Sequence, residues 1–377
     1  MRVLAIAESD AYAKWSAWLL ERAPASWSCE FCLVHSVISP SDRQLATAVA
    51  GTRFGCADVS RHGIVGLRRR IVRDRPDAVV LAATGPTVAA VTASLPRDRP
   101  VIVAALPGVA LPVAERALRA RRHVDVFVTH SRREHQLYRQ GFLGIGADTE
   151  VALATLPFLG HHNASASRAA STRPVFAAQP SVPTSRAERL QALQLLAALG
   201  PPAPLVKLRG EPGERLTHRE AHPYPELWQE LVDRGVVDPW AIEFGGGPLT
   251  DALSEASCLI TVSSTAALEA IDQHRPVVIA DDFGVGERLL NEVFVGSGLI
   301  CPISQQSVTA AGAPLPAWLH ENYFHPPSDD DWIEVMQSRL AHQRRSKRRS
   351  LDIGHLRAVR RGAVRVGVGQ LRHRSRR

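Results

Sequence analysis

The sequence Cys258-Leu-Ile-Thr-Val-Ser-Ser-Thr-Ala-Ala-Leu-Glu-Ala-Ile271 decides the fold, because an apolar run ends in three hydroxyl residues and a helical pattern follows. The apolar run predicts a buried strand over Cys258–Val262, and the residues after it predict a helix over Thr265–Gln273. A helix that begins at the end of a strand points its first amide groups and its positive dipole end at that edge of the sheet. The pattern therefore predicts an anion site.

The predicted anion site uses the three hydroxyl residues and a carboxylate. Phosphate ligands would be Ser263, Ser264 and Thr265, and Glu269 in the following helix would bond a sugar or ribose hydroxyl. Simple capping of the helix by these hydroxyl groups is the alternative interpretation.

The rest of the second half has the same rhythm of strand, turn and helix. Val175–Ala178 precedes Gln179-Pro180 and a helical pattern over Ser185–Leu199. Further strands are predicted over Pro204–Arg209, Trp240–Phe244 and Pro276–Ala280, with a helix over Leu249–Ala256 after Gly245-Gly246-Gly247.

The first half repeats this unit. Apolar runs precede short turns and helices at Val3–Ala7, Ala78–Ala83, Val101–Leu106 and Val124–Thr129. Strands that alternate with helices at this spacing predict parallel sheets covered on both faces. We therefore expect an α/β protein with two Rossmann-like, doubly wound domains that face a cleft. The expected boundaries are domain 1–157, linker 158–173, domain 174–340 and a basic tail at 341–377.

Ligands of open α/β sheets bind beyond the carboxyl ends of the strands, so the turns at these ends supply the other candidates. Lys207 is one of only three lysines in the chain, and Arg209 would share its strand face, so both could bind a diphosphate. Gly245 and Gly246 would allow a close backbone approach to the ligand. The alternatives are a surface cation and a flexible turn.

In the first half, Asp10 follows the first predicted strand and is the candidate general base, with Glu8 as the alternative. His130 ends another strand and would be a second base or a sugar contact. Helix capping by Asp10 and a structural role for His130 are the other interpretations. The acceptor is expected near Asp10, Lys14, Thr84 and Gly108.

The net charge of +8 comes from the tail. Residues 341–377 hold 13 of the 45 Lys and Arg residues but only one of the 37 acidic residues. Such a tail predicts either a solvated end or contact with anionic membrane lipid or nucleic acid, and we expect no specific nucleic-acid partner. Because no apolar run reaches the length of a membrane span, and the N-terminal run is too short for a signal peptide, we expect a cytoplasmic protein, peripheral to the membrane at most.

Two further features resemble redox or metal motifs, but we expect neither redox nor metal chemistry from them. Cys29 and Cys32 have CxxC spacing, but they lie in a predicted strand, where residues three apart point to opposite faces. Asp281 and Asp282 follow a strand without a neighbouring third ligand, so we expect them to bind substrate hydroxyls or solvent rather than a metal ion.

Several of these motifs resemble those of GT-B-fold glycosyltransferases. The Ser-Ser-Thr turn followed by Arg275-Pro-Val-Val278, and Phe176-Ala-Ala-Gln-Pro180, are similar to the capsule-polysaccharide and polysialyltransferase-like branch. Val206-Lys-Leu-Arg209 stands where that branch has Lys-x-His-Pro, so no histidine role carries over. Up to about residue 335, with Ala7–Trp15, Thr84–Thr87 and Leu106–Gly108 as its first-half motifs, the chain resembles a bacterial family assigned to the glycosyltransferases.

The resemblance implies transfer of a sugar from a nucleotide-sugar donor to a hydroxyl of a glycan, a lipid-linked or a small-molecule acceptor. It implies donor binding by Gln179, Lys207, Ser263, Ser264, Thr265 and Glu269, a role in surface polysaccharide or glycoconjugate synthesis, and no cofactor or metal. The alternatives are a nucleotide-sugar epimerase or glycerophosphotransferase on the same fold, or a non-catalytic scaffold with a basic tail.

Overall fold

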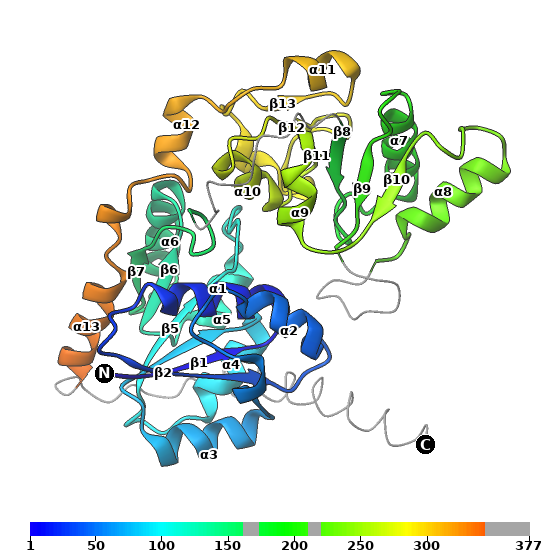
Figure 1. Ribbon diagram of the computed structural model, residues 1–377. Helices are drawn as coiled ribbons and strands as arrows, with labels where there is room; N and C mark the ends of the chain where they lie inside the picture. Colours follow the sequence, from blue (N-terminus) through cyan, green and yellow to red (C-terminus); the bar gives the residue numbers. More distant parts are fainter. Residues whose placement is uncertain (161–172, 210–219, 344–377) are drawn as a thin grey trace, which may run out of the picture. The chain divides into compact units, whose positions relative to one another are not determined.

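The chain folds into two α/β units, each built on a parallel sheet, as a computed structural model shows (Figure 1). The structure describes residues 1–160, 173–209 and 220–343, without the side chain of residue 58. The first unit comprises Met1–Phe158 and the C-terminal residues from Glu321, and the second comprises Leu159–His320. The predicted α/β class with two Rossmann-like domains is confirmed.

The sheet of the first unit has seven strands in the order β3-β2-β1-β4-β5-β6-β7, all parallel to their neighbours. In chain order its elements are β1 (Arg2–Ala7), α1 (Asp10–Glu21), β2 (Ser28–Val34), α2 (Asp42–Val49), β3 (Ser60–His62), α3 (Ile64–Asp74), β4 (Ala78–Ala82), α4 (Gly85–Ser94), β5 (Val101–Ala105), α5 (Glu115–Arg121), β6 (Val126–Thr129), α6 (Arg132–Gly144) and β7 (Glu150–Leu153).

Both faces of this sheet are covered, which explains why its strands are continuous apolar runs. Alternate residues of β1 pack in different clusters: Val3 lies with Trp15 of α1, and Leu4 lies with Leu67 of α3. The helices α1, α2 and α13 (Trp332–Gln343) cover one face, and α3, α4, α5 and α6 cover the other.

The sheet of the second unit has six parallel strands in the order β10-β9-β8-β11-β12-β13. Its elements are β8 (Arg173–Ala177), α7 (Arg186–Ala197), β9 (Leu205–Lys207), α8 (Tyr224–Asp233), β10 (Glu243–Gly245), α9 (Leu249–Ser254), β11 (Ala256–Thr261), α10 (Ala266–Asp272), β12 (Val277–Ala280), β13 (Ile300–Cys301), α11 (Gln305–Ala310) and α12 (Pro316–Glu321).

The predicted C-terminal boundary of the second domain, residue 340, is wrong. Trp332 and Met336 of α13 are buried in the core of the first unit, where the ring of Trp332 meets that of Trp27 at 6.1 Å. The Asp331 carboxylate accepts a hydrogen bond of 2.7 Å from the amide of Leu153, at the end of β7. Because these contacts bury apolar rings and pair backbone groups, α13 belongs to the first unit.

Three further predicted boundaries differ from the structure or fall on residues outside the described ranges. The linker begins later than residue 158, because Phe158 and Leu159 are buried, and residues 161–172 lie outside the described residues. The strand predicted from Trp240 begins only at Glu243, because a turn around Asp238 leaves Trp240 85% exposed. Of the predicted tail, residues 344–377 lie outside the described residues.

The cysteine prediction is confirmed for the CxxC pair. Cys29 packs against the cluster that contains Trp15, whereas Cys32 lies in the cluster on the other face of the sheet. Burial raises the pKa of the Cys32 thiol to about 12, so it stays protonated and unreactive. Both residues are therefore part of the packing of β2.

Candidate functional site

The candidate donor site lies at the topological switch point of the second sheet. The chain leaves β8 towards β9 on one side, while β11 on the other side is followed by β12. Ligands of open α/β sheets bind beyond the carboxyl ends of strands at such a point, because the two loops diverge there. Gln179 follows β8 and Ser263 follows β11, so both residues lie at this place in the fold.

Gln179 and Ser263 are in direct contact. The side-chain oxygen of Gln179 accepts hydrogen bonds from the backbone N of Ser263 at 3.1 Å and from its Oγ at 3.3 Å. The contact joins the loops after the two central strands. The sequence motifs Gln-Pro and Ser-Ser, 84 residues apart, therefore meet in one site.

The sequence pattern predicts that the first amides of the helix face a ligand. In the structure, however, side-chain oxygens accept hydrogen bonds from the loop amides. The amide of Ser264 donates to Oγ1 of Thr261 at 3.3 Å, and the amide of Ala266 donates to Oγ of Ser264 at 3.1 Å. Thr265 is the N-cap residue of α10, but its side chain makes no capping bond. Side-chain oxygens of the protein thus accept hydrogen bonds from the amides of Ser263, Ser264 and Ala266, so these three amides are not left unsatisfied.

Lys207 and the glycines continue the same edge of the sheet. The amide of Ala178 donates to the carbonyl of Lys207 at 3.1 Å, and the amide of Leu208 donates to the carbonyl of Gly245 at 2.8 Å. Lys207 is only 7% exposed, and its ammonium group donates to the carbonyl of Leu208 at 2.6 Å. The edge therefore carries a positive charge beside the loop after β8.

Gly245 is required by a close approach within the sheet. A Cβ atom there would lie 2.9 Å from Cδ1 of Leu205. Gly246 follows the strand and is exposed. The shared-face argument for Arg209 fails, because β9 ends at Lys207 and strand alternation does not reach residue 209. Glu269 is buried in the first turn of α10.

Sequence reasoning missed Arg189, a buried arginine of α7 that organises the loop after β8. Its guanidinium donates to the carbonyls of Gln179 and Pro180 at 3.0 and 2.7 Å, and to that of Pro183 at 2.8 Å. The remaining donors reach Glu220 at 2.5 Å and the carbonyl of His222 at 2.9 Å. Nothing in a helical pattern distinguishes this arginine from a surface one, so the sequence carried no signal for it.

The switch point of the first sheet lies between β1 and β4, and Glu8 closes it. Its buried carboxylate accepts hydrogen bonds from the amide and hydroxyl of Thr84, at 2.8 and 2.7 Å, and from the hydroxyl of Thr87 at 2.7 Å. Both oxygens of Glu8 are therefore used in holding the start of α4. Asp10 begins α1 nearby in the sequence and is half-buried, so it remains the better candidate base.

The prediction that His130 is a catalytic base is wrong. The ring is buried, with Nδ1 2.9 Å from the carbonyl of Ala154 and Nε2 accepting from Nε1 of Trp15 at 2.7 Å. A carbonyl can only accept and an indole N–H can only donate, so the ring is a neutral tautomer with both nitrogens in use. Burial lowers the pKa of His130 to about 4. The group is structural.

Two other expected acceptor residues are engaged within the first unit. The ammonium group of Lys14 lies 4.4 Å from the ring centroid of Phe158, a cation–π contact. Gly108 is buried. The contact of Lys14 with an acceptor stays a prediction.

The two aspartates after β12 form no metal site with their neighbours. The Asp282 carboxylate accepts a hydrogen bond of 2.9 Å from the amide of Ile303, and burial raises its pKa. Across residues 1–160, 173–209 and 220–343, no three His, Cys, Asp or Glu side chains are grouped so as to hold a metal ion.

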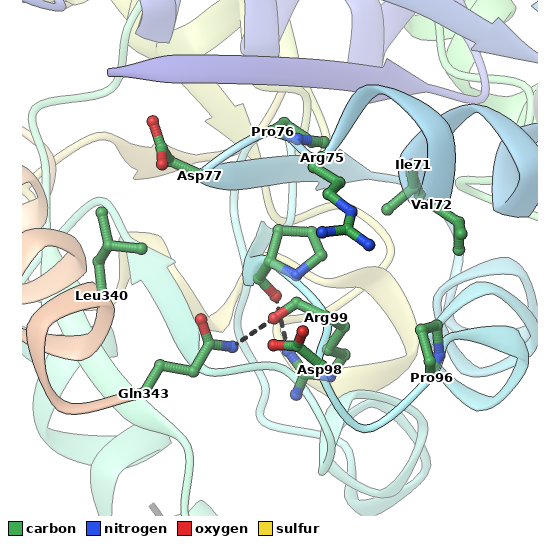
Figure 2. A pocket seen from close by; sticks show the side chains of 11 residues that line it. Ile71, Val72, Arg75, Pro76, Asp77, Pro96, Asp98, Arg99, Leu340 and Gln343 are labelled. Carbon is green, nitrogen blue, oxygen red and sulfur yellow. Dashed lines mark hydrogen bonds between the residues drawn. The ribbon is translucent and has the colours of Figure 1, made fainter. Parts of the chain in front are cut away.

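A cavity of about 430 Å³ lies elsewhere in the first unit (Figure 2). Its walls come from the end of α3, the loops that lead into β4 and β5, and α13: Ile71, Val72, Arg75, Pro76, Asp77, Pro96, Asp98, Arg99, Pro100, Leu340 and Gln343. It therefore lies at the amino ends of the strands, opposite the edge where α/β sheets bind ligands. We do not place the donor or acceptor there.

A family model described as Putative glycosyltransferase (DUF6716) matches residues 3–339. The chain belongs to this family. The match covers both sheets and α13 up to residue 339, so the family extends over the complete two-unit fold. No curated protein has a matching sequence.

Several solved structures have an architecture similar to that of this DUF6716 protein. UDP-GlcNAc 2-epimerase from Methanocaldococcus jannaschii is 12% identical, with a TM-score of 0.57, over 90% of this chain and 99% of that one. The Neisseria meningitidis UDP-GlcNAc 2-epimerase bound to UDP-GlcNAc gives 12% identity and a TM-score of 0.54, over 90% and 100% of the chains. Alr3699/HepE from Anabaena in complex with UDP gives 14% and 0.53, over 92% and 100%. These likenesses support the GT-B type of fold.

Proposed function

We propose that this DUF6716 protein transfers a sugar from a nucleotide-sugar donor to a hydroxyl acceptor, in the synthesis of a surface polysaccharide or glycoconjugate. The observation that carries the proposal is the Gln179–Ser263 contact at the switch point of the second sheet, in a chain whose family is described as glycosyltransferases. Similar folds have been solved with UDP or UDP-GlcNAc bound, so a uridine nucleotide is the first donor to test.

In the proposed donor complex, phosphate oxygens replace the side-chain oxygens that now hold the loop amides. Gln179 and the hydroxyl of Ser264 release the amides of Ser263 and Ala266, which then bond the phosphate. Lys207 supplies the positive charge, Glu269 bonds a ribose or sugar hydroxyl, and Gly245 and Gly246 allow the donor to approach the backbone. Thr265 and Arg209 are secondary ligands in this proposal.

The proposed reaction exchanges one bond at the anomeric carbon. The acceptor oxygen forms a bond to that carbon, Asp10 takes the proton of the acceptor hydroxyl, and the bond from the carbon to the phosphate oxygen breaks. Negative charge then grows on the leaving nucleoside phosphate, where Lys207 and the loop amides would stabilise it. The bonds and the proton of this proposed reaction are accounted for without a cofactor or a metal ion. Product analysis would identify the acceptor as a glycan, a lipid-linked molecule or a small molecule.

Calorimetry on a double variant tests the donor site. Ser264→Ala with Lys207→Ala should weaken nucleotide binding about a hundredfold, because an ionic hydrogen bond contributes roughly 1.5–3 kcal/mol. Val236→Ser, an exposed position of the same unit, serves as a matched control. Unchanged affinity of the double variant for every nucleotide tried would remove the donor-site assignment. If the protein epimerised a sugar nucleotide in the absence of an acceptor, the epimerase alternative would replace the proposed transferase function.

A further inference from the structure

The outer face of α3 combines exposed valines with arginines. Five residues share this face at spacings of three and four, and we call them the α3 face: Val65, Arg68, Arg69, Val72 and Arg73. Val65 is 64% exposed and Val72 is 40% exposed, while Leu67 and Ile71 on the opposite side are buried against the sheet. The helix therefore has a packed apolar side and an outward side that is apolar and basic.

The charge of α3 and its C-cap is strongly positive. Residues 64–75 contain five arginines, and the single acidic residue is Asp74. Asp74 is paired with Arg73 at 2.6 Å and with Arg70 at 3.5 Å. It offsets part of the charge of the outward face, and five arginines against one aspartate leave residues 64–75 with a net charge of +4. A helix of this kind favours an anionic surface that also accepts apolar side chains.

The end of α3 borders the point where the basic tail begins. Val72 and Arg75 line the cavity described above, and Leu340 and Gln343 of α13 line the same cavity (Figure 2). The side-chain amide of Gln343 donates to the carbonyl of Arg99 at 2.7 Å, which fixes the end of α13 there. All 13 Lys and Arg residues of the tail follow Gln343 in the sequence. The end of α13 thus lies beside the end of α3 at one edge of the first unit.

We propose that the α3 face docks this protein on a membrane surface rich in anionic phospholipid. Arginine heads would contact the lipid phosphates while their aliphatic stems lie along the interface, and Val65 and Val72 would enter the headgroup region. The exposed valines favour a lipid surface over a nucleic acid, whose phosphate backbone offers apolar side chains no partner. None of the helices in the described residues could span a bilayer.

Vesicle sedimentation with the full chain tests the α3 face. Val65→Ser with Arg69→Gln changes two exposed neighbours, of which Arg69 makes no hydrogen bond or ion pair to the described part of the chain. On vesicles of phosphatidylcholine and phosphatidylserine at low salt, we expect this variant to partition about tenfold less than wild type. Vesicles of phosphatidylcholine alone should bind neither protein well.

A matched variant on another helix separates the face from general charge loss. Arg139 and Leu143 on α6 have the same spacing and are exposed, with Leu143 at 68%, so Arg139→Gln with Leu143→Ser should leave partitioning unchanged. A chain ending at Gln343 should retain binding that the α3 variant still reduces. The proposal is overturned if the α3 variant partitions like wild type, if the α6 variant loses as much, or if the α3 variant loses affinity for duplex DNA but not for vesicles. Thermal unfolding of each variant checks that it folds.

Discussion

Gln179 and Ser263 close the switch point of the second sheet with one side-chain oxygen, which accepts from both the backbone N and the Oγ of Ser263. The same edge carries Lys207 and the loop amides of Ser264 and Ala266. In the first sheet Glu8 makes the equivalent connection to Thr84 across β1 and β4. In each unit, a polar side chain from the loop after one central strand thus accepts hydrogen bonds from the loop after the neighbouring strand.

Gln179→Glu should weaken nucleotide binding while preserving the loop. A carboxylate oxygen can still accept both hydrogen bonds from Ser263, but its charge would repel a phosphate at the neighbouring amides. We expect nucleotide affinity to fall at least about tenfold, with unfolding unchanged within about 1 kcal/mol. Calorimetry and denaturant unfolding measure the two effects. Gln179→Ala is the control without charge, and equal nucleotide affinity of Gln179→Glu and wild type would contradict the site.

Asp10→Asn should separate catalysis from folding. Loss of the proposed base should lower kcat by about a hundredfold to ten-thousandfold, with only a small change in stability because Asp10 is half-buried at the start of α1. Glu8→Gln should instead destabilise the protein by roughly 1–3 kcal/mol, since its amide group cannot accept all three hydrogen bonds from Thr84 and Thr87. Full turnover by Asp10→Asn, with any nucleotide sugar that wild type uses, would exclude it as the base.

Much of the fold could be predicted because buried parallel strands are continuous apolar runs. The strand that ends before Ser263 and the strand that ends before Gln179 are examples, and the Gln-Pro and Ser-Ser motifs gave the correct edge of the sheet. A helical pattern, however, does not reveal which sheet it covers. α13 is amphipathic in the sequence, yet only the burial of Trp332 beside Trp27 shows that it belongs to the first unit.

The site could be predicted only where function depends on local sequence. His130 looked like a base because it follows a strand, but its state is set by Trp15, 115 residues earlier, and by the carbonyl of Ala154. The role of Arg189 depends on carbonyls from two separate loops. Both roles arise from tertiary contacts, which a single sequence does not show.

The free energy of unfolding of the first unit should fall as the pH is lowered, partly because of His130. Its folded pKa, about 4, lies below the usual value of 6.5. Between these values the unfolded state binds more protons than the folded one, so unfolding free energy rises with pH and the contribution is complete above about pH 6.5. Lowering the pH from 6.5 to 4 should remove about 3 kcal/mol. Denaturant unfolding at both values measures this, and His130→Gln should flatten the slope; an equal slope in the variant would contradict the assignment.

Arg189→Met should destabilise the second unit and weaken nucleotide binding together. The substitution leaves the carbonyls of Gln179 and Pro180 and the carboxylate of Glu220 without their donor, at a cost of roughly 3–5 kcal/mol. Arg189→Lys keeps the charge but supplies three donors instead of five, so it should be intermediate. Denaturant unfolding and calorimetry give both quantities. Arg189→Met with wild-type stability would show that these hydrogen bonds do not hold the loop.

Trp332→Ala tests the assignment of α13 to the first unit. Removing a buried tryptophan side chain that packs against Trp27 should cost about 3–5 kcal/mol. Because the ring lies in the core beneath β1 and β2, hydrogen exchange should accelerate in residues 1–153 and stay unchanged in residues 173–320. Trp318→Ala is the matched control, since Trp318 stacks on Phe294 in the second unit, and it should give the reverse pattern. Faster exchange of β11 and β12 in Trp332→Ala would return α13 to the second domain, as the sequence alone predicted.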